Sequence, residues 1–131
     1  MGDGHHGWAA AEIVLFLLDC LVRERHDVLT LFPDMQDGMM EWGTKSAIQG
    51  IATSYGSVGC SINYQTNEKA LCAFTIEPHS TREPKYVEIV FPFSLKRVLP
   101  VSPELTLEID RLEKRTRVRF RSGNAMLLLE R

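Results

Sequence analysis

Residues 104–121 read ELTLEIDRLEKRTRVRFR, and this stretch decides the expected fold. Apolar and polar side chains alternate along its first seven residues and again along its last seven, a pattern typical of two half-buried β-strands. The residues between them provide the turn. A pairing in which residue numbers sum to 225 places Leu107 opposite Val118 on one face and Glu108 opposite Arg117 on the other. The stretch therefore predicts an antiparallel hairpin with a buried apolar face and a charged face.

The charged face of this hairpin has two interpretations. The predicted register pairs three acidic residues with three arginines, as Glu104–Arg121, Glu108–Arg117 and Asp110–Arg115. Only Arg119 lies opposite a neutral residue. The arginine-rich strand 115–121 could bind nucleic acid or another polyanion, with Arg115, Arg117, Arg119 and Arg121 as the possible anion-binding residues. Alternatively the strand is a structural charge ladder, and a neutralised ladder attracts few anions.

The final strand, expected at residues 125–130, is apolar on both faces. A hairpin about the Gly123-Asn124 turn places Met126 and Leu128 beside the arginines. Apolar side chains on both faces predict that both faces of the sheet are covered. One face would be covered by helices of this chain, and the other by the connection at residues 92–103 or by a partner chain.

The sequence before residue 104 predicts three more strands and two helices. The strands are expected at residues 60–64, 72–76 and 86–91, and the helices at 8–31 and 44–55. The expected fold class is α+β, with two N-terminal helices packed on an antiparallel sheet of about five to six strands. Residues 1–7 are interpreted as a flexible leader and residues 8–131 as a single domain.

Composition indicates an intracellular protein that does not insert into a membrane. The longest apolar run, residues 13–18, is far shorter than the roughly 20 residues that a membrane span needs. The three cysteines include no Cys-x-x-Cys pair, so they are interpreted as reduced core residues, with a Cys60–Cys72 disulfide as the alternative. A cytoplasmic or nuclear location is expected. The net charge of −2 argues against attraction of the whole protein to nucleic acid.

The sequence contains no recognisable catalytic, cofactor-binding or metal-binding motif. The four histidines have no base, nucleophile or second ligand at a diagnostic spacing. The expectation is a protein that is not an enzyme and binds no cofactor.

The leading functional hypothesis is a protein–protein interaction module, a small subunit or adaptor that homodimerises or docks into a larger complex. Its motivation is an excess of apolar surface, and the residues expected at the interface are Ile13, Phe16, Leu17, Met39, Met40, Trp42, Met126 and Leu128. Two structural alternatives to an interface remain. The apolar segment 13–22 could lie across the sheet, and the Met-rich residues could close the core. Polyanion binding by strand 115–121 is the second functional hypothesis. The third is a small-molecule pocket between sheet and helices, lined by Tyr64, Phe74 and Phe91.

Overall fold

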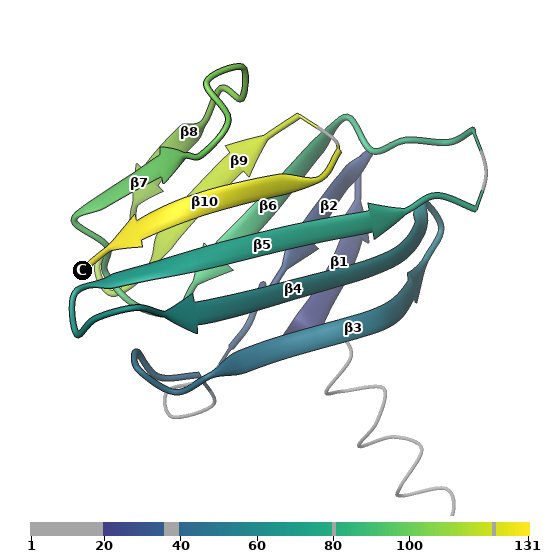
Figure 1. Cartoon of the computed structure of the whole chain (residues 1–131). Helices are drawn as coiled ribbons and strands as arrows, with labels where there is room; N and C mark the ends of the chain where they lie inside the picture. The colour runs from purple at the N-terminus through teal and green to yellow at the C-terminus, as the bar shows by residue number, and fades with distance from the viewer. Residues whose placement is uncertain (1–19, 36–39, 80, 122) are drawn as a thin grey trace, which may run out of the picture.

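The structure is a computed structural model that describes residues 20–35, 40–79, 81–121 and 123–131 (Figure 1). The predicted leader and the first half of the first predicted helix lie outside these ranges. The described residues contain ten strands: β1 Val22–Arg25, β2 Val28–Leu31, β3 Ser46–Thr53, β4 Gly56–Tyr64, β5 Lys69–Glu77, β6 Tyr86–Phe91, β7 Arg97–Pro100, β8 Glu108–Arg111, β9 Thr116–Phe120 and β10 Ala125–Glu130. The fold is therefore all-β, and the α+β prediction is wrong.

The strands form two five-stranded sheets that pack face to face as a sandwich (Figure 1). The order in the first sheet is β1-β2-β6-β9-β8, and in the second sheet β3-β4-β5-β10-β7. All neighbouring strands are antiparallel except β2 and β6. That parallel pair arises because the chain leaves the first sheet after β2, builds β3, β4 and β5 in the second sheet, and then returns to the first.

The core lies between the two sheets. The inner residues of the central strands are almost completely buried: Leu29, Leu31, Val87, Ile89, Phe91, Val118 and Phe120 come from the first sheet, and Val58, Ile62, Cys72, Phe74, Leu127 and Leu129 from the second. Phe74 and Phe120 meet across the two sheets, with ring centroids 5.8 Å apart in an edge-on arrangement. Alternate residues of each strand therefore point inward, and the others form the two outer faces.

Residues 22–31, predicted as the second half of a helix, instead form the β1–β2 hairpin. The two turn residues, His26 and Asp27, have φ angles of 53° and 62°, which suits the two-residue turns that join antiparallel strands. Each strand has only four residues. Four residues are too few for a period of two to be told from a helical period by sequence alone.

Residues 44–55, predicted as the second helix, contain the edge strand β3. The helical signal came from Ile48 and Ile51, three residues apart. In the structure the register shifts between these two isoleucines, so that Ile48 pairs with Cys60 and Ile51 with Val58. A β-bulge, at which Gly50 has a φ of 67°, inserts the extra residue. Both isoleucines therefore face the core between the two sheets, although their spacing of three residues is also that of neighbours on one face of a helix.

The predicted hairpin of residues 104–121 forms only in part, because its first strand is limited to β8 and residues 104–107 lie outside any strand. Its predicted register is wrong by two residues. Glu108 pairs with Arg119, Ile109 with Val118, and Asp110 with Arg117. A shift by two returns every side chain to its original face, so the alternation that excludes a shift by one cannot exclude a shift by two.

Strand β10 does not pair with β9, contrary to the prediction of a second hairpin. After β9 the chain crosses to the other sheet, where β10 lies between β5 and β7 (Figure 1). Met126 and Leu128 consequently lie on the outer face of the second sheet and not beside the arginines. The connection expected to cover a face instead contributes β7, which extends the edge of that sheet.

Candidate functional site

The outer face of the second sheet has an uncharged central region. Two neighbouring rows of side chains cross this face without a charged residue. One row contains Asn63, Leu71, Leu128 and Leu99, and the other contains Ala47, Ser61, Ala73, Met126 and Val101. These residues point outward because their neighbours along the chain, such as Cys72 and Leu127, are fully buried on the inner side.

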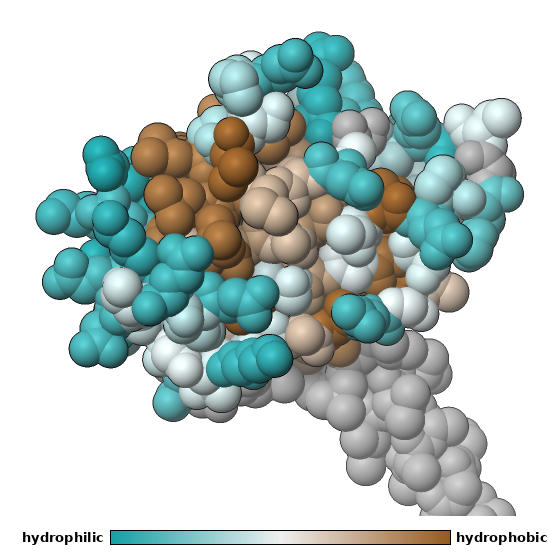
Figure 2. Space-filling view, viewed as in Figure 1, coloured by the Kyte–Doolittle hydropathy of each residue, from teal (hydrophilic) through white to brown (hydrophobic). Residues whose placement is uncertain are grey.

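Six of these residues form what we name the apolar patch: Leu71, Ala73, Leu99, Val101, Met126 and Leu128. Three of them are strongly exposed for their type, with Leu99 at 41%, Val101 at 53% and Met126 at 46% of full exposure. Figure 2 shows hydrophobic side chains gathered where Figure 1 places β7, β10 and the adjoining part of β5, with hydrophilic side chains around the edge. The patch is continuous because hydrogen-bonded neighbours contribute it from three adjacent strands.

A hollow of about 520 Å³ adjoins the patch at the end where β7 leads into the following loop. Val101, Leu105 and Met126 give it apolar walls, while Glu104 and Asn124 contribute polar groups. The side chain of Asn124 is itself held, because its Oδ1 accepts a hydrogen bond of 2.9 Å from the backbone N–H of Ile76. A flat apolar face that ends in a hollow can accommodate a protruding side chain of a partner.

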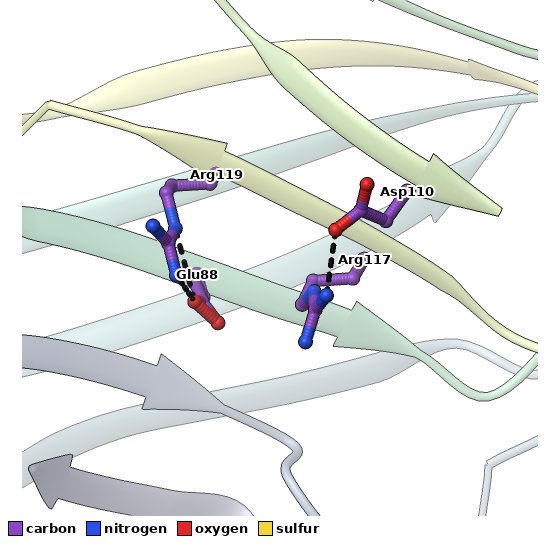
Figure 3. Close-up of polar contacts among 4 residues, drawn as sticks. All are labelled: Glu88, Asp110, Arg117 and Arg119. Atoms are coloured by element: carbon purple, nitrogen blue, oxygen red, sulfur yellow. Dashed lines mark hydrogen bonds and ion pairs between the residues drawn. The ribbon is translucent and has the colours of Figure 1, made fainter. Parts of the chain in front are cut away.

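The outer face of the first sheet has the opposite character. One row across it contains Arg23, Thr30, Glu88, Arg119 and Glu108, so four of its five residues are charged. Figure 3 shows two ion pairs on this face: an Arg119 nitrogen lies 2.7 Å from Glu88, and an Arg117 nitrogen lies 2.6 Å from Asp110. The hydrogen bond and negative charge of Glu88 raise the pKa of Arg119 above its ordinary value.

The structure corrects the pairing predicted for the arginines. Arg119, expected to lack a partner, makes two hydrogen bonds to Glu88 and stacks 5.1 Å above the ring of Tyr86. Glu88 lies on β6, which sequence reasoning had not placed beside this strand. Arg115 donates to the backbone carbonyl of Met35 at 3.1 Å rather than to a carboxylate. The arginine strand is thus largely occupied by contacts within the protein.

Of the eight residues predicted for a partner interface, the structure describes Met40, Trp42, Met126 and Leu128, and it does not bring these four together. Ile13, Phe16, Leu17 and Met39 lie outside the described residues. Met40 is buried in the core. Trp42 packs edge-on against Tyr64 and Phe93 at 5.0 and 5.4 Å, and its indole N–H donates to the carbonyl of Asn67. Of the four described residues, Met126 and Leu128 are the two that lie on the outer face of a sheet.

Sequence reasoning missed Leu71, Leu99 and Val101 as members of this surface. Leu71 precedes Cys72 in a strand whose inner face was recognised, so its outward position follows from the alternation. Leu99 and Val101 belonged to a proline-flanked connection with no strand expected in it. The runs of alternating residues there are only four long, which gave no usable signal.

The three cysteines are buried thiols, as the sequence predicted. The sulfur atoms of Cys60 and Cys72 lie 3.6 Å apart on neighbouring strands, without a bond between them. The hydrogen bond between Cys72 and Cys60, together with burial, raises the pKa of Cys72 well above its ordinary value. Because the thiolate is the reactive form, Cys72 is a poor nucleophile, and both cysteines are buried as part of the core.

The small-molecule pocket predicted between sheet and helices is the third functional hypothesis. No helix faces either sheet among the described residues, so a pocket between sheet and helices is not found there. Phe74 lines the hollow beside the apolar patch, whereas Tyr64 lines a separate surface hollow near Trp42. Phe91 is fully buried. The three residues therefore do not form one binding site.

In the described ranges, no three acidic, histidine or cysteine side chains are grouped closely enough to hold a metal ion. No helix within those ranges has both the length and the hydropathy required to span a bilayer. Comparisons of this chain with protein-family models, curated proteins and solved structures find no match.

Proposed function

We propose that this protein is a non-enzymatic interaction module, a small subunit or adaptor, that binds a protein partner through the apolar patch. The observation that supports this proposal is the joint exposure of Leu99, Val101 and Met126 on one face of a sheet. A contiguous exposed apolar patch is costly in water, at about 25 cal/mol for each Å² of apolar surface. Soluble proteins rarely keep such a patch unless a partner covers it.

The form of the surface also suits a protein ligand. Interfaces usually have an apolar centre and a polar rim, and they often seat an anchoring side chain in a pocket. Here Ser61 and Asn63 border the patch on the β4 side, and Lys69 and Glu130 lie at one end of it. The hollow beside Val101 and Met126 would accept the anchor.

The arginine face gives less support to the polyanion alternative. The two arginines at its centre, Arg117 and Arg119, form ion pairs with Asp110 and Glu88. An incoming phosphate would have to displace these carboxylates, and the gain in Coulomb energy would be small where charges are already balanced. We therefore advance the apolar patch as the functional surface.

A photo-crosslinking side chain at position 126 of the full chain, expressed in its own cells, tests this proposal. The matched control carries the same side chain at position 112, because Leu112 is 45% exposed in the β8–β9 turn and Met126 is 46% exposed. We expect a discrete crosslinked protein product from position 126 and none from position 112. Leu128→Lys in the same chain should abolish that product.

Equal labelling from both positions, or no protein product from either, would show that the patch is not a binding surface. Mass spectrometry of the product identifies the partner and shows whether it is a second copy of this chain.

A further inference from the structure

We propose that the partner at the apolar patch is a second copy of this chain, packed face to face about a twofold axis that runs along the row of Ala73, Met126 and Val101. This inference rests on the proposed function and names the partner. It follows from the order of charges along β5, from the composition of the row on the axis and from the area of the face.

The outward side chains of β5 read, in order, Lys69, Leu71, Ala73, Thr75 and Glu77. A positive charge stands at one end, a negative charge at the other, and a small residue at the centre. A twofold axis that passes through Ala73 across the strand reverses this order in the second copy. Lys69 of one copy then lies over Glu77 of the other, and the reverse contact occurs at the opposite end. The strand is thus electrostatically complementary to itself when antiparallel.

The same axis places apolar side chains over one another. Because a rotation about the row leaves the lateral position of each strand unchanged, Met126 meets Met126 and Val101 meets Val101 of the second copy. Methionine suits such a position, since its flexible thioether fills irregular gaps. Ala47 and Ser61 continue the row on β3 and β4. Their small side chains allow two sheets to approach without a clash.

The area of the face allows a small dimer interface. Strands of four to nine residues, at about 3.4 Å per residue and 4.8 Å between strands, cover about 600 Å² of plane in this sheet. The accessible surface of a bumpy face exceeds its plane area. However, β7 and β10 extend from the axis row toward the Lys69 end and β3 toward the Glu77 end, so the two copies overlap over part of this face and the interface lies toward the small end of the size range. Two such sheets would pack with their strands within about 30° of each other, as aligned sheets do.

Light scattering and sedimentation of the purified full chain, over a range of concentrations, test the proposal first. We expect the mass of a dimer. Met126→Lys should raise the dissociation constant by about a hundredfold or more, because the axis brings two added ammonium groups together and removes both from water. Leu112→Lys, the equally exposed control in the β8–β9 turn, should leave the mass unchanged. A wild-type monomer at every concentration would overturn the proposal.

A charge swap tests the antiparallel arrangement. Glu77→Lys alone should weaken the dimer, since it places two positive charges together at each end. Adding Lys69→Glu, together with Glu130→Gln because Glu130 is the cross-strand neighbour of residue 69, should restore most of the affinity, because each copy then presents the reversed pair. Failure of the triple variant to recover would show that the copies are not arranged about Ala73, whatever their mass.

A cysteine at position 73 supplies an independent measurement. Facing sheets lie about 10 Å apart, so a short bismaleimide should join two Ala73→Cys chains into a covalent dimer. Thr30→Cys, on the outer face of the first sheet, should give none. If the purified chain is monomeric while the photo-crosslink at position 126 captures a different protein, the proposed function stands and the second-copy inference fails. If position 126 captures nothing, both fail.

Discussion

Replacement of Arg119 by glutamate should destabilise the protein more than the same change at Arg117. Arg119 lies between two carboxylates, Glu88 on β6 and Glu108 on β8. The Glu88 side chain is only 8% exposed, and its charge is compensated by the guanidinium 2.7 Å away. The substitution removes that compensation and places a third negative charge in the same row.

The expected magnitude follows from the burial of the two partners. Removal of one partner from a fully buried ion pair costs about 3–5 kcal/mol. Here Glu88 is buried but Arg119 is 37% exposed, and water screens part of the interaction. We therefore expect a loss of about 2–3 kcal/mol in the free energy of unfolding. Arg117 and Asp110 are 39% and 62% exposed. The loss for Arg117→Glu should be about 1 kcal/mol or less.

Urea unfolding followed by circular dichroism at one fixed protein concentration measures both losses. With a slope of about 1–3 kcal/mol per molar urea, Arg119→Glu should lower the midpoint by roughly 0.7–3 M. Adding Glu88→Gln to Arg119→Glu should recover part of the loss, because an amide can donate a hydrogen bond to the new carboxylate.

An Arg119→Glu variant as stable as the wild type would refute this reasoning. So would a larger loss at Arg117, because that result would mean that the predicted register, in which Arg119 has no acidic neighbour, describes the sheet better than the observed one.

Three further predictions concern other parts of the sandwich. Gly56→Ala should lower the free energy of unfolding by about 1–3 kcal/mol, because φ is 134° there and a Cβ would lie 2.2 Å from a backbone carbonyl oxygen of β5. Gly123 has a similar φ but open space around it, so Gly123→Ala should cause a smaller loss in the same urea assay. Cys60 and Cys72 should react slowly with a thiol reagent at pH 8 in the folded protein and rapidly in denaturant, and fast labelling of the folded chain would contradict their burial. The ion pair with Arg97 lowers the pKa of Glu130, so its small stabilisation is present above the ordinary carboxyl pKa and is lost as the pH falls. An NMR titration should show that pKa rising again in Arg97→Gln, and an unchanged value would exclude the pair as its cause.

Sequence reasoning could identify strands wherever alternation continued long enough to separate two periods. Residues 56–64, 69–77, 86–91 and 116–120 satisfy this condition, and each is a strand close to its expected position. The short strands β1, β2 and β7 do not satisfy it. In β3 the bulge brought Ile48 and Ile51 to a helical spacing, so local periodicity indicated the wrong structure.

The candidate site was predicted only in part, because local alternation shows which residues point outward but does not show which strands are neighbours. Met126 and Leu128 were recognised as outward apolar residues because they alternate with the buried Leu127 and Leu129. Their neighbours could not be identified, since Leu71 and Leu99 come from strands more than 25 residues away in the sequence. Which strands lie side by side depends on where the chain crosses between sheets, and no local pattern records those crossings.

What the sequence determined by itself is therefore the two-sidedness of individual strands: which side chains of each long strand point to the core, and which point to solvent. This property is local, because successive residues of a strand point to opposite faces whatever the strand pairs with. Only the tertiary structure decided the pairing of β10 with β5 and β7, the contact of Arg119 with Glu88, and the union of six apolar residues on one face. These features depend on long-range packing of two sheets around a common core, where the free energy of burial is shared among residues distant in the chain.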